Sequence, residues 1–213
     1  LFLYLVAAAV AALGRTPGAV RLPAAVCGTL TIPVTYWMTR AWFRRSTALL
    51  SAAIMATMLW HVHLSRTGFR AITLPLVIGA FLAVTGNALR SQRPLTWALA
   101  GALYGLSFYT YVAARFTPVP LLGLAVYLLW VGRGRDLWPG GLYFLGGALL
   151  SLVPLAVYAL DHWQVVMGRP SQVSILNPEV HGGAFWRTLW SHLVRTLGMF
   201  FVRGDTIARH NVP

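Results

Sequence analysis

The sequence has 213 residues, of which 58% are hydrophobic and only 10% are charged, and its formal net charge is +13. Soluble domains carry roughly one quarter charged residues, so this composition excludes a soluble fold and predicts an all-α protein that crosses a membrane several times. The apolar residues form blocks of about 18 to 22 without the alternation of strands, which excludes a transmembrane barrel.

The first predicted element, Leu1 to Leu13, is apolar but too short to cross a bilayer, because a spanning helix needs about 20 residues. We expect it to lie at the outer membrane interface or to be the end of a truncated helix. The sequence opens inside this run without a basic leader, so it does not resemble a signal peptide. We interpret the sequence as an internal fragment of a longer chain.

Six spanning helices are predicted next, at about 19–39, 46–64, 71–89, 95–112, 117–131 and 139–160. With the first element they make residues 1–160 a partial transmembrane module. All 17 basic residues are Arg, and alternate loops between the spans carry seven of them while the opposite loops carry five. Because positive charge resists translocation, the side with seven Arg is assigned to the cytoplasm.

Residues 161–213 are predicted to form an exoplasmic loop, because Pro170, Asn177-Pro178 and Gly182-Gly183 break helices and add polarity. Within this loop, residues 184–202 carry aromatic and aliphatic side chains at helical spacing, interrupted by Arg187, His192 and Arg195. This pattern predicts an amphipathic helix that lies at the membrane interface.

The Arg residues lie at helix ends and do not form one basic face, so membrane lipids or phosphates are the expected partners and nucleic acid is not. Cys27 is the only cysteine, which excludes a disulfide framework and a Cys-based metal site. His61 and His63 are two residues apart and therefore lie on different faces of a helix. Packing or membrane-interface roles are favoured for both over a metal site.

Two outer loops keep Arg in compact groups. Arg66 and Arg70 belong to the segment 65–70, and Arg115 follows an aromatic, polar helix end at 104–111 that is typical of a cavity wall. These three Arg are candidate ligands of a lipid phosphate, because the guanidinium group stays charged and its donors match phosphate oxygens. The alternative is that they extend to lipid head groups.

A second candidate region is the polar tail behind the amphipathic helix. It either lines a site on the exoplasmic side or is an ordinary solvated loop, and its candidate residues are Asp205, Arg209, His210 and Asn211. Asp161, His162, Glu179 and His181 are more simply explained by exit into water than by catalysis.

Several segments in this order resemble one known family. They are Leu1 to Leu5, Gly18 to Ala25, Gly28 to Pro33, Ser65-Arg66, Gly68 to Arg70, Gly105 to Ser107, Tyr109 to Tyr111, Arg115, Gly204-Asp205 and Arg209 to Asn211. The sequence is similar to the membrane-embedded glycosyltransferases that use polyprenyl-phosphate sugars and have the C-type fold, a family that includes protein O-mannosyltransferases and aminoarabinose transferases.

The resemblance implies an inverting transfer of a sugar from a polyprenyl phosphate to an acceptor hydroxyl, at the exoplasmic face of a bacterial plasma membrane. The acceptor is a protein, a lipid or a glycan. An Asp acts as the base in this family and basic residues stabilise the phosphate as it leaves. The family's catalytic Asp lies upstream of the stretch that resembles Leu1 to Leu5, so no catalytic residue is assigned here and the fragment alone is expected to be inactive.

No cofactor is predicted. Some relatives have an acidic residue in the loop that corresponds to residues 65–70, and this sequence has none there, so a divalent metal is not expected. The alternative function is a transporter or flippase of lipid-linked intermediates, which would also need Arg near phosphate but predicts paired halves and acids within the spans. A scaffold whose Arg contact only lipids is a third possibility.

Overall fold

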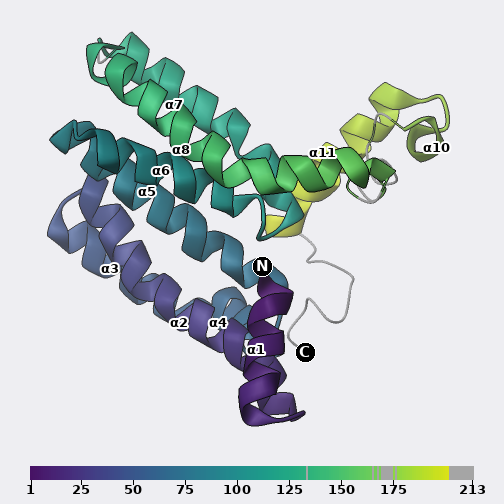
Figure 1. Ribbon diagram of the computed structural model, residues 1–213. Helices are drawn as coiled ribbons and strands as arrows, with labels where there is room; N and C mark the ends of the chain where they lie inside the picture. The colour runs from purple at the N-terminus through teal and green to yellow at the C-terminus, as the bar shows by residue number, and fades with distance from the viewer. Residues whose placement is uncertain (133, 165, 167, 169–174, 176, 202–213) are drawn as a thin grey trace. The chain divides into compact units, whose positions relative to one another are not determined.

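The computed structural model describes the chain except for residues 133, 165, 167, 169–174, 176 and 202–213. Every regular element in the described parts is a helix, which confirms the predicted all-α class (Figure 1). The elements are α1 (Phe2–Leu13), α2 (Pro17–Trp42), α3 (Arg45–Thr57), α4 (Leu59–Thr67), η1 (Arg70–Ile72), α5 (Thr73–Ser91), α6 (Pro94–Ser107), η2 (Val112–Phe116), α7 (Pro118–Trp130), α8 (Gly134–Asp161), α10 (Pro178–His181) and α11 (Phe185–Phe201).

Four helical stretches are long and apolar enough to cross a membrane, and a bent pair raises the number to five. The four are Pro17–Trp42, Arg70–Ser91, Val112–Trp130 and Trp138–Asp161, and the bent pair is α3 with α4. The fourth predicted span, 95–112, corresponds to α6, which has 14 residues and ends at Ser107. A helix of that length covers about 21 Å at 1.5 Å per residue, so the predicted count of six spans stays a prediction.

The predicted span 46–64 is one apolar block in the sequence but two helices in the structure. Helices α3 and α4 meet at Met58, whose backbone is extended, and their axes differ by 52°. Neither Pro nor Gly lies at the break. The hydroxyl of Thr57 bonds to the carbonyl oxygens of Ala53 and Ile54, a pattern that bends helices.

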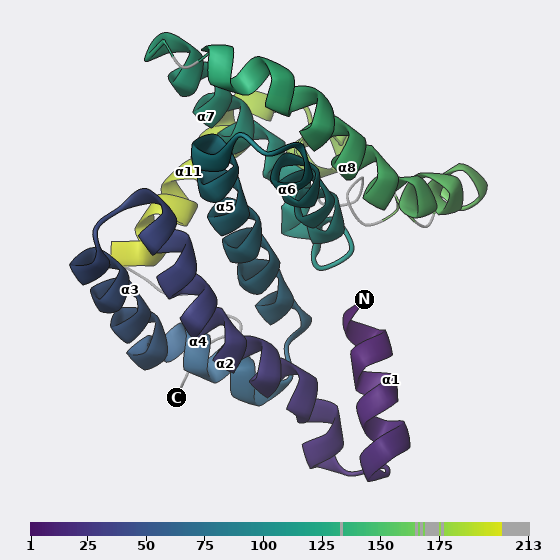
Figure 2. The same cartoon turned by 60° about the vertical axis from the view of Figure 1, so that its left-hand side comes forward.

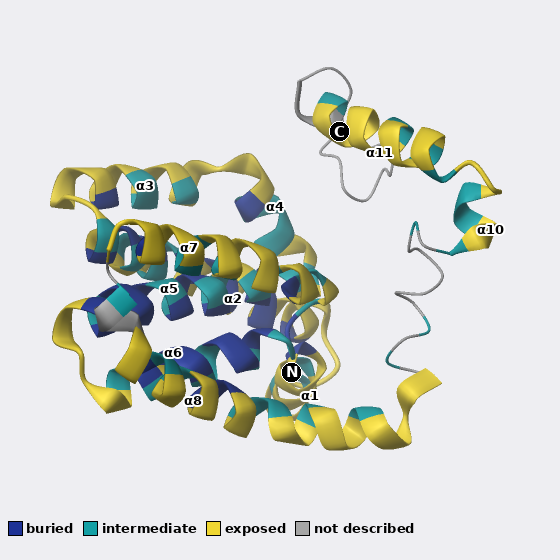
Figure 3. Cartoon of the chain, turned by 90° about the horizontal axis from the view of Figure 1, so that it is seen from above, coloured by how far each residue is buried: buried dark blue, intermediate teal, exposed yellow. Residues whose placement is uncertain are grey.

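Helices α2, α5 and α6 carry most of the buried residues, and Figure 3 shows the buried surface concentrated on them. At one end, α2 is tied to α5: the indole Nε1 of Trp42 donates to the carbonyl oxygen of Leu82 at 2.9 Å, and Arg90 donates to that of Ala41. A Cβ placed on Gly86 would lie 2.8 Å from that of Ala41, as expected where small residues let helices approach.

The contact between α6 and α8 is closer still. A Cβ on Gly101 would lie 1.9 Å from the carbonyl oxygen of Phe144, and one on Gly147 would lie 2.0 Å from that of Ala98. These glycines therefore allow the two backbones to touch. Gly105 lies in the same contact, because a Cβ there would lie 2.8 Å from the carbonyl oxygen of Ala148.

The chain divides into two compact units, residues 1–154 and 155–213, and the division falls within α8. The predicted domain boundary between residues 160 and 161 stays a prediction. In the first unit, α1 packs along the beginning of α2 (Figure 2), and Phe2 is buried with Ala24, Cys27 and Ile72. Most other α1 side chains are exposed, and the predicted interfacial position of α1 remains a prediction.

Candidate functional site

The segment that carries Arg66 and Arg70 is a tight connection between α4 and α5. Gly68 ends α4 with φ of 75°, a left-handed conformation that glycine adopts without strain. The amide of Phe69 then donates to the carbonyl oxygen of Leu64, and Arg70 begins the short helix η1. Both Arg side chains are exposed at this turn.

The segment that carries Arg115 folds in a different way. After α6 ends at Ser107, the chain turns through Thr110 and enters η2, which holds Arg115, before α7 begins at Pro118. The hydroxyl of Thr110 donates to the carbonyl oxygen of Ser107, and the hydroxyl of Tyr109 donates to that of Ser151 at 2.7 Å. Arg115 is exposed.

These two segments are far apart in the sequence but contact one another in the structure. The guanidinium carbon of Arg70 lies 5.6 Å from the centroid of the Tyr111 ring, within cation–π distance. The rings of Phe69 and Tyr111 lie 6.3 Å apart. The structure therefore brings together the two loops that were predicted to bind one phosphate.

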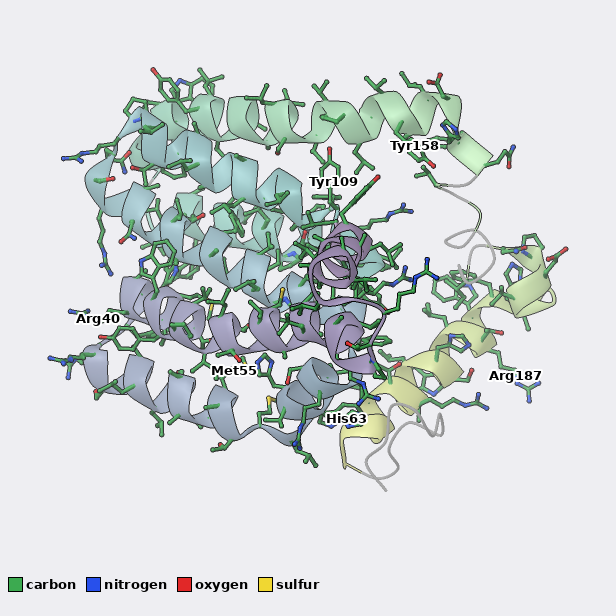
Figure 4. The ribbon with its side chains drawn as sticks, turned by 60° about the horizontal axis from the view of Figure 1, so that its bottom comes forward. Arg40, Met55, His63, Tyr109, Tyr158 and Arg187 are labelled. Atoms are coloured by element: carbon green, nitrogen blue, oxygen red, sulfur yellow. The ribbon has the colours of Figure 1, made fainter. Side chains whose placement is uncertain are left out.

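The beginning of the chain lies at the same place. The nitrogen of Leu1 is 3.5 Å from the carbonyl oxygen of Tyr109, so α1 starts beside the turn that leads to Arg115. Arg40 lies at the other end of this unit from Tyr109 and His63 (Figure 4). The Arg-bearing turns at residues 66–70 and 109–115 thus share one end of the helices, as the alternation of loops predicted.

Arg21 and Tyr111 were not among the predicted site residues. A Cβ on Gly68 would lie 3.6 Å from Cγ of Arg21, so this Arg at the beginning of α2 adjoins the same turn. Arg21 could have been found from the sequence, because it is one of the five Arg in the outer loops. No role in the site was predicted for it. No pattern in the sequence indicated that Tyr111 would contact Arg70.

Only some of the residues at the end of α6 that were predicted to line a cavity do so. Ser107 and Thr110 are buried and donate to backbone carbonyl oxygens, so their hydroxyls stabilise the turn. Tyr104 is buried in an aromatic cluster with Phe81, Phe108 and Phe144. Its ring contributes to an apolar cavity.

That cavity, of about 500 Å³, lies among α5, α6, α7 and α8. Its lining is almost entirely apolar, and the part contributed by α7 extends from Pro118, at the beginning of this helix, to Leu128, near its end. Pro118 follows Arg115 by three residues. On α7 the lining therefore starts three residues after Arg115, while Leu89, Trp97 and Gly141 line the cavity near the opposite ends of α5, α6 and α8.

His61 has a structural role, as predicted. Its ring is buried, and Nε2 donates to the carbonyl oxygen of Gly28 at 2.9 Å, which ties α4 to α2. His63 Nε2 is buried without a hydrogen-bond partner. Over the described residues, no three His, Cys, Asp or Glu side chains gather in a way that could hold a metal. That no metal is required stays an expectation.

The predicted tail residues Asp205, Arg209, His210 and Asn211 lie outside the described residues. Their proposed role on the exoplasmic side remains a prediction.

Comparison with known proteins gives two matches. Residues 1–160 match the family described as dolichyl-phosphate-mannose-protein mannosyltransferase. Over 152 residues the chain is 29% identical to the undecaprenyl phosphate-alpha-4-amino-4-deoxy-L-arabinose arabinosyl transferase of Erwinia tasmaniensis, an alignment that covers 68% of this chain and 27% of that protein. The chain thus spans about a quarter of the length of this relative. No solved structure matches the chain.

Proposed function

The chain belongs to the dolichyl-phosphate-mannose-protein mannosyltransferase family, and we propose that the complete protein transfers a sugar from a polyprenyl phosphate to an acceptor hydroxyl. The family match covers residues 1–160 and confirms the resemblance seen in the sequence. The observation that carries the proposal is that the helices which line an apolar cavity are joined, at one end, by two Arg-bearing turns in contact with one another. A polyprenyl phosphate likewise has one strongly anionic end and one long apolar end.

The phosphate end is assigned to Arg115, Arg70 and Arg66, with Arg21 beside the same turn. As the glycosidic bond breaks, negative charge develops on the departing phosphate, and guanidinium groups in place would stabilise this charge in the transition state. Tyr111 supports the arrangement, since its ring holds Arg70 at the loop that leads to Arg115.

The apolar end is assigned to the cavity lined by α5, α6, α7 and α8. Its volume of about 500 Å³ and its apolar lining suit a segment of a prenyl chain. Because the α7 part of its lining begins at Pro118, a lipid with its phosphate at Arg115 would direct its prenyl chain along α7.

The attack on the sugar needs a base, and the resemblance places it in a segment that precedes the region matching Leu1. A base and a single displacement give an inverting transfer, on the exoplasmic side of the plasma membrane if the Arg count sets the orientation.

The test of the phosphate site is turnover of a radiolabelled polyprenyl-phosphate sugar by vesicles that contain the complete protein. Arg115→Ala removes hydrogen bonds to a charged group, so we expect kcat/KM to fall about ten- to a hundredfold. Arg93→Ala, at the beginning of α6 on the opposite side, is the matched control and should keep normal turnover. Unchanged turnover in Arg115→Ala would overturn the assignment.

The test of the cavity compares donors of different chain length. Ala125 lines the cavity, and its neighbour Val126 is 56% exposed on the outer side of α7. We expect Ala125→Phe to raise KM for a long prenyl donor more than for a short one, whereas Val126→Phe changes neither. Equal effects of the two variants would mean that the prenyl chain of the donor binds outside this cavity.

The flippase alternative predicts that the labelled lipid moves across the membrane without release of polyprenyl phosphate.

A further inference from the structure

The cavity among α5, α6, α7 and α8 is short for a polyprenyl chain. The part of its lining that α7 contributes extends from Pro118 to Leu128, which corresponds to about 15 Å at a rise of about 1.5 Å per residue. Each prenyl unit adds four carbon–carbon bonds of about 1.5 Å to the lipid, so about three extended units cover this length. A longer prenyl chain therefore has to fold back inside the cavity or leave it.

The end of the cavity opposite Pro118 is closed by packed side chains. Leu89, Trp97 and Leu128 line the cavity there, and with Ala88 they form one buried cluster. The indole ring of Trp97 also packs on the backbone of α8, because a Cβ on Gly140 would lie 2.2 Å from this ring. A prenyl chain that left the cavity at this end would displace several buried side chains at once.

A second hollow, which we call the α2–α7 groove, adjoins the cavity. It has a volume of about 260 Å³. Its lining residues come from α2, α5 and α7 and are Met38, Thr39, Trp42, Phe43, Leu82 and Leu124. Leu124 also lines the cavity, so this one side chain borders both hollows. Helix α5 contributes to both as well, since Thr85, three residues after Leu82, lines the cavity.

The groove is a defined part of the fold and opens at the surface of its unit. The indole Nε1 of Trp42 donates to the carbonyl oxygen of Leu82 at 2.9 Å, which joins the walls from α2 and α5. Phe43, at one end of the groove, is 62% exposed. Leu124 is half-buried, and a Leu side chain can change between staggered rotamers without a shift of the backbone. The passage from the cavity to the groove at Leu124 is thus less obstructed than the closed end.

We propose that the prenyl chain of a long donor passes Leu124 and that its distal units lie in the α2–α7 groove. This inference rests on the proposed sugar transfer from a polyprenyl phosphate, and it adds a second binding site for the end of the lipid away from the phosphate. Because the free donor already lies in a bilayer, the gain comes from van der Waals packing in a shaped groove and not from removal of water. Donors longer than about three units should therefore bind more tightly than shorter ones.

The first experiment locates the distal end of the bound donor. A donor analogue with about ten prenyl units and a photoactivatable diazirine on its last unit is irradiated in membrane vesicles that contain the complete protein. Mass spectrometry then identifies the labelled residues. We expect label at Met38, Phe43 or Leu82, which an excess of the unmodified long donor removes. Label at Trp97 with none at these three residues, or competed label elsewhere only, would overturn the proposal.

The second experiment fills the groove and leaves the cavity unchanged. Met38→Trp adds bulk to the groove, whereas the matched control Val26→Trp changes a 46% exposed position of the same helix that lines neither hollow. We expect Met38→Trp to raise KM about three- to tenfold for the long donor and to leave KM for a three-unit donor unchanged. Val26→Trp should change neither. An unchanged KM for the long donor, or the same rise for both donors, would contradict the proposal.

Cross-linking requires binding but no turnover, so the two experiments distinguish this inference from the proposed function. Label in the groove without release of polyprenyl phosphate would support the prenyl route and argue against sugar transfer. Turnover of both donors without label in the groove would support sugar transfer and overturn the prenyl route.

Discussion

Tyr111 has a positioning role for Arg70, because its ring lies 5.6 Å from the guanidinium group. Such a contact at an exposed site contributes about 0.5 to 1 kcal/mol, so its loss should raise KM for the lipid donor about two- to fivefold in Tyr111→Leu. Tyr111→Phe keeps the aromatic ring and should behave nearly as the natural protein. Steady-state kinetics of the complete protein with both variants check this. If KM is the same in Tyr111→Leu as in the natural protein, Arg70 does not need the ring.

Substitution of the two histidines of α4 should have different effects on the free energy of unfolding. His61→Leu removes a buried hydrogen bond to Gly28 and should lower the free energy of unfolding by about 1 kcal/mol. His63→Leu removes a ring whose buried Nε2 has no hydrogen-bond partner, so stability should be unchanged or higher. Thermal unfolding of the complete protein in detergent separates them. Equal destabilisation by both substitutions would contradict the assigned roles.

The Arg residues of the candidate site could be predicted from the sequence, but the contacts between them and other residues could not. Arg66, Arg70 and Arg115 could be selected from the sequence because Arg in an outer loop departs from the usual distribution of charge. The contact of Arg70 with Tyr111 joins residues 41 positions apart and depends on how α4, α5 and α6 pack. Periodicity describes one helix at a time, so it could not pair these loops.

At the scale of elements, the packing of α6 on α8 depends on glycine. A Cβ on Gly101 would meet the backbone carbonyl of Phe144, and a backbone atom cannot move aside as a flexible side chain can. Gly101→Ala should therefore lower the melting temperature of the complete protein, since overpacking costs about 1 to 3 kcal/mol.

The matched control is Gly146→Ala on α8, where a Cβ would meet nothing within 4 Å. This substitution should leave the melting temperature unchanged or raise it slightly, because Ala favours helix over Gly by about 1 kcal/mol. A similar fall in both variants would mean that the effect does not come from the close approach of α6 to α8.

Helix boundaries were harder to predict than helix existence. The block 46–64 is apolar throughout, so hydropathy treats it as one span, whereas Met58 separates α3 from α4. Thr57 and His61, on either side of the break, make side-chain to backbone hydrogen bonds, which hydropathy ignores. Likewise α6 ends at Ser107 because the hydroxyls of Ser107 and Thr110 bond to backbone carbonyls and stabilise a turn.

For the whole molecule, composition alone was sufficient to predict the class of fold. Aliphatic and aromatic side chains remain widely exposed on α7 and α8, for example Leu122 at 66% and Leu150 at 77%. In water such surfaces would aggregate, but in a bilayer these apolar side chains contact the acyl chains of the lipids. The first unit can therefore bind a phosphate at the membrane surface with the polar groups at its Arg-bearing end.

The orientation of the chain gives the last prediction. The loop between α2 and α3 carries Arg44 and Arg45 and should face the cytoplasm, while the turn after α4 should face outward. In a protein with Cys27→Ser, we expect a membrane-impermeant maleimide to label Thr67→Cys in intact cells, because Thr67 is exposed beside Gly68. Ser46→Cys, also at an exposed position, should be labelled only after the cells are permeabilised.

The two positions lie at opposite ends of the bent pair α3 and α4, so their labelling also tests whether this pair crosses the membrane. Labelling of both positions in intact cells would mean that the pair does not cross. The reverse pattern, with only Ser46→Cys labelled, would put Arg66, Arg70 and Arg115 at the cytoplasmic face. Sugar transfer at the exoplasmic face would then be excluded for this Arg cluster, even though the family membership of the chain would be unaffected.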